Sequence, residues 1–260
     1  MTNDKHGIPH YFKREEDGFK ASGLSRSPWH RDKIAGGPLS ALLAAIGDEA
    51  GFDPGFDITR FTVDILGAVP HAALLTPRVT CLRAGRQMQV HRVEILAGET
   101  VTAQAHFVLA REAETPAVTV PSPYPSPDSL AEDDFMASAS MAGAIKSKRV
   151  HGAVRQPGPA AAWLSCDGEI ILGTKPSQFV KAALFADFGS GMGSVLSVKE
   201  WSYANLDISL HLLRMPVGDW FLIDAHSETS GNGHGVARTT FADAEGIYAY
   251  GTQTMFIAPQ

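Results

Sequence analysis

Two stretches of the chain show the same succession of hydrophobic patterns. In the first stretch, Pro38 suits an opening helical turn because its missing N–H is not needed there. Apolar residues then recur at helical spacing with alanines between them, at Leu39, Leu42, Leu43 and Ile46. A helix that is apolar on most of its sides is predicted to be buried. Four strand-like runs follow it, at residues 60–70, 74–85, 86–98 and 99–110.

The second stretch repeats this order of elements. A helix is predicted over residues 175–191, and four strand-like runs follow at residues 204–218, 219–233, 234–246 and 247–258. The proline that closes the first strand lies 40 residues before the end of the last strand in one stretch and 42 in the other, from Pro70 to Ala110 and from Pro216 to Ala258. Both stretches also turn at glycine between their second and third strands, at Gly85 and at Gly231 and Gly233. This agreement indicates an internal duplication.

The repeats are separated by a segment that favours neither helix nor strand. Residues 111–140 contain five prolines among serines and acidic residues. We therefore expect an N-terminal unit at residues 1–112, a linker or insert at 113–158 and a C-terminal unit at 159–260. A buried helix wrapped by an antiparallel sheet is the hotdog arrangement, so the predicted fold is α+β, a double hotdog.

Composition and charge exclude several classes of protein. The net charge of −6 argues against nucleic acid as the main partner. Without an apolar signal region or an apolar run of 18 residues, neither secretion nor membrane insertion is expected. Cys81 and Cys166 lie far apart with no CxxC motif, which favours two buried thiols in a reducing compartment and a cytoplasmic location. His30, His226 and His234 lack other ligands at metal-binding spacing, so no metal and no cofactor is expected.

The start of the first helix is unusual because two glycines, Gly36 and Gly37, directly precede Pro38. One interpretation is a tight turn packed under Trp29. The other is that the backbone must come close to a ligand, since a glycine has no Cβ to block the approach. In that case a carbonyl oxygen would meet the N–H groups at the helix N-terminus, where partial positive charge is available.

Several motifs together resemble the acyl-CoA thioesterase II family. They are Trp29 with Gly36, Gly37 and residues 41–45, then residues 85–105, and above all residues 201–225 and 241–254. The resemblance covers nearly the whole chain and is weakest between residues 111 and 160. It implies hydrolysis of fatty acyl-CoA to a free acid and coenzyme A, without a metal or a covalent nucleophile.

The resemblance also implies site residues. The family holds a water molecule with an Asp, a Gln and a hydroxyl residue of the second hotdog. These positions fall on Asp207 of "NLDISL", on Gln253 of "GTQTM" and near "HSETSGNG". An ungapped count places Glu228 at the hydroxyl position, so we assign that role to the adjacent Thr229. In this arrangement Asp207 takes a proton from water, Gln253 and Thr229 orient the water, and Gly36 and Gly37 polarise the substrate carbonyl.

Strand alternation gives two of these residues different surroundings. Asp207 shares a face with Ser209 and His211, opposite the apolar face of Leu206, Ile208, Leu210 and Leu212. It therefore points away from the helix unless a bulge shifts the register or the strand is buried on both faces. Gln253 alternates with Ala249, Gly251, Met255 and Ile257, so it is predicted to face inward as a core amide or a catalytic one.

The predicted function is therefore an acyl-CoA thioesterase, with acyl-CoA as its substrate and a homo-oligomer as a possible assembly. One alternative is an acyl-thioester hydratase or dehydratase on the same fold, for which His30 is the available histidine near the first helix. Another is an acyl-CoA-binding protein without activity, which Glu228 in place of a hydroxyl residue would favour. The basic cluster Lys146, Lys148 and Arg149 is either a solvated turn or a contact for the CoA phosphates.

Overall fold

The first half of the chain supplies a long helix and one side of a large sheet. The computed structural model describes residues 7–118, 121–136, 144–154 and 156–260. The elements of this half are β1 (His10–Glu15), β2 (Gly18–Ala21), a 3-10 turn (Gly23–Ser25), α1 (Gly36–Ala50), β3 (Phe56–Ile65), β4 (Leu74–Ala84), β5 (Met88–Ala97) and β6 (Thr100–Arg111). The four predicted strand-like runs correspond to β3 to β6, whereas β1 and β2 have no counterpart among the predicted elements.

The second half supplies the other side of the sheet. Its elements are a 3-10 turn (Pro127–Ser129), β7 (Ile145–His151), β8 (Ala160–Cys166), β9 (Glu169–Ile171), α2 (Gln178–Phe185), α3 (Gly189–Met192), β10 (Trp201–Asn205), β11 (Asp207–Leu212), β12 (Phe221–Thr229), β13 (His234–Asp243) and β14 (Gly246–Pro259). The helix predicted over residues 175–191 is divided into α2 and α3, and the first predicted strand into β10 and β11.

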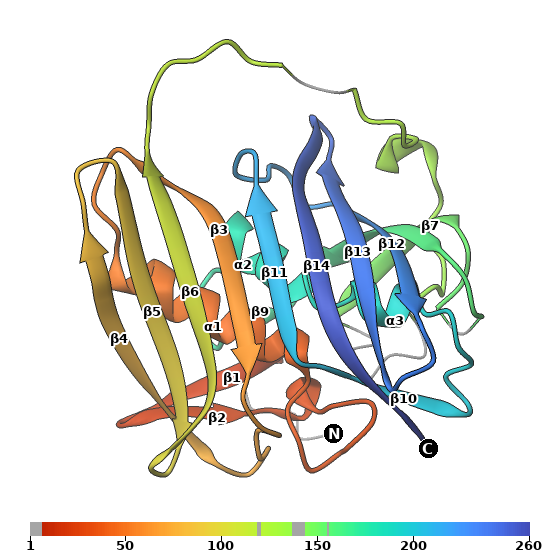
Figure 1. The fold of residues 1–260 in the computed structure, drawn as a ribbon, viewed down its shortest axis with the longest axis horizontal. Coiled ribbons are helices and arrows are strands. Elements are labelled where there is room, and N and C mark those ends of the chain that lie inside the picture. Colours follow the sequence, from red (N-terminus) through yellow and green to blue (C-terminus); the bar gives the residue numbers. More distant parts are fainter. Residues whose placement is uncertain (1–6, 119–120, 137–143, 155) are drawn as a thin grey trace.

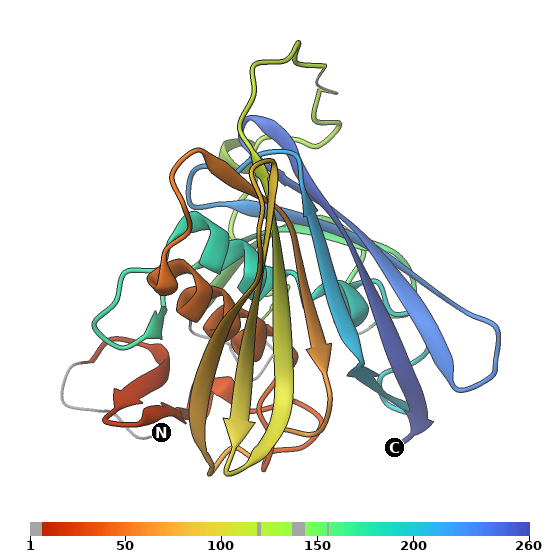
Figure 2. The ribbon, with the colours of Figure 1, turned by 60° about the vertical axis from the view of Figure 1, so that its left-hand side comes forward.

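All these strands belong to one sheet with a two-fold repeat in its order. The strands pair as β7-β8-β12-β13-β14-β11-β3-β6-β5-β4-β2-β1-β9, and β10 is attached to β14. The two halves meet at the antiparallel pair of β3 and β11, and the same order of strands runs outward from this pair as far as β1 on one side and β7 on the other. Strand β9 is the exception, because it comes from the second half and pairs in parallel with β1 at the edge of the first half. Figure 1 shows the central strands side by side, and Figure 2 shows α1 and α2 together on one side of them. The predicted double hotdog and its duplication are therefore confirmed.

Helix α1 is buried along most of its length, as its pattern predicts. Leu42, Leu43 and Ala44 have no exposed surface, and only the last three residues of the helix are exposed. The helix lies directly against the sheet at Gly47, where a Cβ atom would come 2.4 Å from Cζ of Phe107 on β6. A side chain at this position would force the helix and the sheet apart.

The turn between α2 and α3 is held by a side chain from the sheet. Ser177 caps the start of α2 by accepting a bond from the N–H of Val180, and Phe185 is the last residue of this helix. The carbonyl of Asp187 then accepts a 2.7 Å bond from Gln253 Nε2, and the N–H of Ser190 donates a 2.9 Å bond to Gln253 Oε1. Gln253 thus satisfies two backbone groups where the helical pattern is interrupted.

The segment predicted as a linker, residues 113–158, contains strand β7. This strand pairs with β8, and Ile145 and Ser147 are buried while Lys146 between them is exposed. The chain therefore returns to the sheet before residue 158, and the unit boundaries at residues 112 and 158 stay predictions. Across the part of the chain that the structure describes, no helix is long and apolar enough to cross a membrane.

Candidate active site

A cavity of about 700 Å³ lies where the start of α1 meets the α2–α3 turn. The end of β3, strand β10 and the loop before α1 complete its walls. Most of the lining side chains are apolar, among them Leu39, Ile65, Val69, Phe188, Met192 and Tyr203. Asp187 is the only acidic residue among the described residues that line it. A mostly apolar cavity with a few polar groups is the usual form of a small-molecule site.

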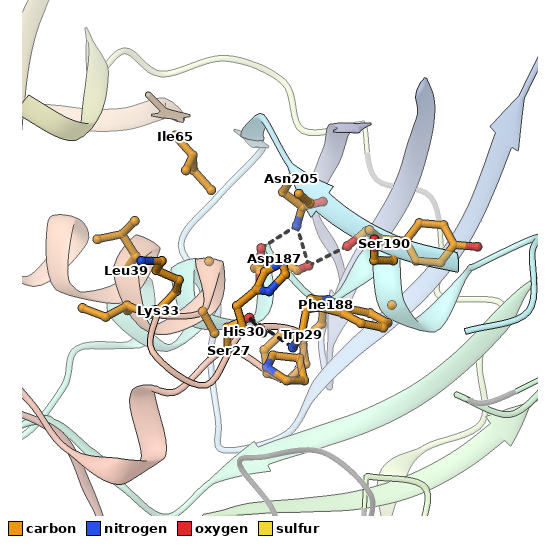
Figure 3. Close-up of a pocket in the computed structure, with 18 of the residues that line it drawn as sticks. Ser27, Trp29, His30, Lys33, Leu39, Ile65, Asp187, Phe188, Ser190 and Asn205 are labelled. Atoms are coloured by element: carbon orange, nitrogen blue, oxygen red, sulfur yellow. Dashed lines mark hydrogen bonds between the residues drawn. The ribbon is translucent and has the colours of Figure 1, made fainter. Parts of the chain in front are cut away.

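Asp187 follows α2 and faces this cavity between the two helices, as Figure 3 shows. Its Oδ1 accepts a 2.5 Å bond from Asn205 Nδ2, and the N–H of Gly37 in α1 also donates to the carboxyl group. Burial raises the pKa of Asp187 to about 6, and these two bonds oppose the rise because they favour the ionised form. At pH 7 the carboxylate is mostly ionised and more basic than an ordinary aspartate, which suits a general base.

Asn205 reaches the cavity because of a bulge between β10 and β11. Asn205 pairs with Met255 of β14 while Ser209 pairs with Thr252, so four steps along one strand match three along the other. The extra residue shifts the alternation of side chains, so Asn205 lines the cavity although Asp207, two residues later, does not. Asn205 Oδ1 is buried and has no hydrogen-bond partner among the described residues.

Gln253 faces inward, as its alternation on β14 predicts, and only 1% of its surface is exposed. It does not line the cavity. Both ends of its amide bind the α2–α3 turn, through the N–H of Ser190 and the carbonyl of Asp187. The geometry therefore makes Gln253 a positioning residue for Asp187, whereas the sequence predicts that it orients the water.

The structure does not bring Asp207 or Thr229 to the cavity. Asp207 lies on the outer face of the sheet, where its Oδ1 accepts a 2.6 Å bond from the N–H of Thr254. A bulge could have turned the Asp207 side chain toward the helix. The bulge in the structure does not do so, and the side chain that faces the cavity is that of Asn205. Thr229 lies at the end of β12, and its hydroxyl donates to the carbonyl of His234 at 2.7 Å. The predicted arrangement of Asp207, Gln253 and Thr229 around one water is thus not formed.

Glu228, at the position where the ungapped count expects a hydroxyl residue, also lies away from the cavity. Its exposed carboxylate pairs with Arg238 on β13 at 3.2 Å and with His226 at 3.7 Å. This charge therefore contacts neither Asp187 nor the cavity.

The two glycines at the start of α1 bring the helix close to Asp187. A Cβ atom at Gly36 would lie 2.2 Å from Asp187 Oδ1, and one at Gly37 would lie 2.9 Å from the carbonyl oxygen of Leu184. The two glycines were predicted to let a ligand come close to the backbone. In the structure, the groups that come close to them are the Asp187 carboxylate and the Leu184 carbonyl. Gly36 itself lines the cavity, and its N–H has no acceptor among the described residues. A ligand oxygen placed there would meet this N–H at the positive end of the helix.

Asp187 and Asn205 are site residues that the sequence patterns and the resemblance do not predict. The sequence does hold a signal for Asp187, since it is a single acid at the end of an apolar helix, followed by Gly189 and Gly191. The repeat supplies a second signal, because Asp48 occupies the corresponding end of α1. For Asn205 there is no comparable signal, since the polar and apolar residues of this strand alternate in sequence without a break at the bulge.

The cavity therefore combines a basic carboxylate, an amide that holds it and a helix N-terminus. This set of groups can take a proton from a small polar molecule and stabilise negative charge on a nearby oxygen. No group of three potential metal ligands occurs within the described ranges.

Comparison with known proteins identifies the family on both halves. The N-terminal domain of acyl-CoA thioesterase matches residues 25–110, and the C-terminal domain of acyl-CoA thioesterase matches residues 117–257. No curated protein sequence matches the chain significantly.

Solved structures of similar fold include three bacterial proteins. A putative thioesterase from Novosphingobium aromaticivorans is 20% identical over 95% of this chain and 98% of its own, with a TM-score of 0.71. The acyl-CoA thioesterase II TesB2 from Mycobacterium marinum is 14% identical over 92% of this chain and 97% of its own, with a TM-score of 0.68. A hot dog fold protein of unknown function from Alicyclobacillus acidocaldarius is 13% identical over 95% of both chains, with a TM-score of 0.76. These likenesses show a shared fold, and the match of both family domains shows that the chain belongs to the acyl-CoA thioesterase family.

Proposed function

We propose that the chain hydrolyses acyl-CoA thioesters in this cavity, with Asp187 as the general base. The observation that carries the proposal is the position of this carboxylate. It faces a mostly apolar cavity beside the start of α1, and burial raises its pKa to about 6. The family match supports a thioester substrate, and the apolar walls suit an acyl chain.

The reaction needs one water molecule and no covalent intermediate. Asp187 takes a proton from the water, and the resulting hydroxide adds to the thioester carbonyl. The N–H of Gly36 stabilises the negative charge that develops on the carbonyl oxygen. When the tetrahedral intermediate collapses, the carbon–sulfur bond breaks and Asp187 returns the proton to the departing thiolate. The products are a carboxylic acid and coenzyme A.

Asn205 and Gln253 support this step from two sides. Asn205 holds the Asp187 carboxylate with its amide N–H, and its Oδ1, which has no partner among the described residues, can accept a hydrogen bond from the water. Gln253 fixes the backbone turn from which Asp187 projects. All of these groups come from one chain, so the site requires no second copy.

The first test compares Asp187→Asn with Asp207→Asn, using thiol release from acyl-CoAs of two to sixteen carbons and from aryl-CoAs. We expect Asp187→Asn to lose a factor of about a hundred or more in kcat, because general-base catalysis contributes that much. Asp207→Asn should retain activity, since an amide oxygen can still accept the bond from Thr254. The reverse result would restore Asp207 as the base and refute the role of Asp187.

The same assay separates the two alternative functions. His30 lines the cavity mouth, so a hydratase remains the second candidate, and it would add water to an enoyl-CoA without releasing thiol. An acyl-CoA-binding protein would bind the esters and release no thiol from any of them. Glu228 gives little support to the binding protein, because this residue lies away from the cavity in its pair with Arg238.

A further inference from the structure

The cavity has its positive charges at the mouth. Among its lining residues, Lys33 comes from the loop before α1 and Lys199 from the loop before β10. Lys199 is exposed, and it forms no ion pair within the described part of the chain. Lys33 pairs with Asp32 at 2.9 Å, but the Asp32 side chain is 74% exposed, so this pair is weak and exchangeable. The two lysines therefore leave positive charge on both sides of the opening.

The loop before α1 is basic in an acidic protein. The chain carries a net charge of −6, yet residues 26–33 hold Arg26, Arg31 and Lys33 against a single acid, Asp32. Arg26 and Arg31 are exposed beside the cavity residues of this loop. A local excess of positive charge around an apolar cavity attracts a ligand with an apolar end and an anionic end.

The basic cluster noted in the sequence has other partners. Lys146 pairs with Asp167 at 2.7 Å, and Arg149 pairs with Asp133 at 2.9 Å. Lys148 donates to the carbonyl of Pro127 and lies over the Trp220 ring. These three residues belong to β7 and do not line the cavity. The lysines at the cavity mouth are thus the better placed cations for a ligand inside it.

We propose that Lys33 and Lys199 form a subsite for the phosphate groups of the phosphopantetheine carrier that delivers the acyl chain. The inference rests on the proposed thioester substrate and adds its orientation. The acyl chain lies among the apolar walls, the thioester lies at Asp187, and the phosphates lie at the mouth between the two loops. The same phosphate chemistry is present in coenzyme A and in the prosthetic group of an acyl carrier protein.

The test uses the double charge reversal Lys33→Glu with Lys199→Glu. Its control is Lys13→Glu with Lys20→Glu, which changes the net charge equally at paired positions of β1 and β2. The first readout is the dissociation constant of free coenzyme A, measured by calorimetry at low and high salt. The second is the ratio of kcat/KM for an acyl-CoA to kcat/KM for the matching S-acyl pantetheine, which carries no phosphate. A third arm repeats the kinetics with the acyl carrier protein ester.

The reversal is expected to weaken binding of coenzyme A by about twenty-five-fold at low salt, from about a fivefold effect for each of the two charge contacts, and less at high salt. The kinetic ratio should fall in parallel, and the control should leave both readouts unchanged. If the loss is confined to the carrier protein ester, the subsite stands and that ester is its source of phosphate. Equal losses for acyl-CoA and S-acyl pantetheine, or no loss in any arm, would overturn the proposal. Should wild type bind coenzyme A through these lysines but release no thiol, the subsite stands and the hydrolase proposal fails.

Discussion

The basicity of Asp187 results from two opposing effects of its surroundings. Burial against the cavity walls disfavours the ionised carboxylate, whereas Asn205 and the N–H of Gly37 favour it by donating hydrogen bonds. Burial is the larger effect, so the pKa rises to about 6. A base with this pKa is ionised at neutral pH and still accepts a proton from water more readily than a solvated aspartate does.

We therefore expect hydrolysis to depend on pH through this group. The value of kcat/KM should fall tenfold per unit below about pH 6, because only ionised Asp187 can act as the base. Asn205→Ala removes a donor that favours ionisation, so the midpoint should move to higher pH by about one unit. Rate profiles from pH 4.5 to 9 for both proteins measure this shift. An unchanged midpoint in the variant would show that Asn205 does not tune Asp187.

The same pKa shift predicts a stability effect for Asp187→Asn. Because the folded protein holds the Asp187 proton more tightly than the unfolded chain, the wild type loses stability as the pH rises toward about 6. The amide that replaces the carboxyl group in the variant does not titrate. The free energy of unfolding of the variant relative to wild type should therefore increase by about 1 kcal/mol between pH 5 and pH 8. Urea denaturation at the two pH values tests this, and a difference that shrinks with pH would contradict the raised pKa.

At the scale of elements, the site depends on the interruption between α2 and α3. In a continuous helix, the backbone N–H and carbonyl groups around Asp187 would bond to one another along the helix. Gln253 instead takes the Asp187 carbonyl and the Ser190 N–H, and Gly189 allows the close contact, because a Cβ there would lie 2.7 Å from Gln253 Oε1. The strand β14 thereby fixes the backbone that carries the base.

This arrangement predicts a linked loss of stability and activity in Gln253→Leu. The variant leaves the Ser190 N–H and the Asp187 carbonyl buried without partners, which should cost about 2 to 5 kcal/mol of unfolding free energy. Turnover should fall as well, because the base loses its fixed position. Thr252→Val, on the exposed face of the same strand, is the control and should change neither quantity by much. Lost turnover with unchanged stability would mean that Gln253 contacts the reacting water and does not merely position Asp187.

The elements were more predictable from the sequence than the site was. The alternation on β14 placed Gln253 inward, and the apolar spacing in α1 predicted its burial, since both depend on long uninterrupted patterns. The site depends on two interruptions. The bulge after Asn205 reverses the expected alternation, and the break after α2 arises from a side chain far along the chain, Gln253. Neither interruption is encoded in the neighbouring residues. The alternation by itself predicts that Asp207 points away from the helix, as it does in the structure, whereas the catalytic role of Asp207 came from the family resemblance.

For the whole molecule, the duplication predicts two equivalent cavities between the helices, one for each half. The two cavities differ in size and in the side chains around them. The large cavity lies between the start of α1 and the end of α2. Between the end of α1 and the start of α2 lies its counterpart, with a volume of only about 40 Å³ and with Asp48 and Ser177 among its lining residues. Phe107 from β6 packs at Gly47 of α1, whereas Gln253 from β14 packs at Gly189. The first half therefore keeps an acid but has an aromatic ring where the second half has a positioning amide.

One site per chain is the expected consequence. A cavity of about 40 Å³ is too small for an acyl thioester, and exposed Asp48 lacks the burial that raises the pKa of Asp187. Asp48→Asn should therefore leave kcat within about twofold of wild type, whereas Asp187→Asn alone should remove the activity. Calorimetric titration with a thioether analogue of an acyl-CoA, which cannot be hydrolysed, should give one molecule bound per chain. Two molecules per chain, or half of the activity remaining in Asp187→Asn, would show that the first half holds a working site as well.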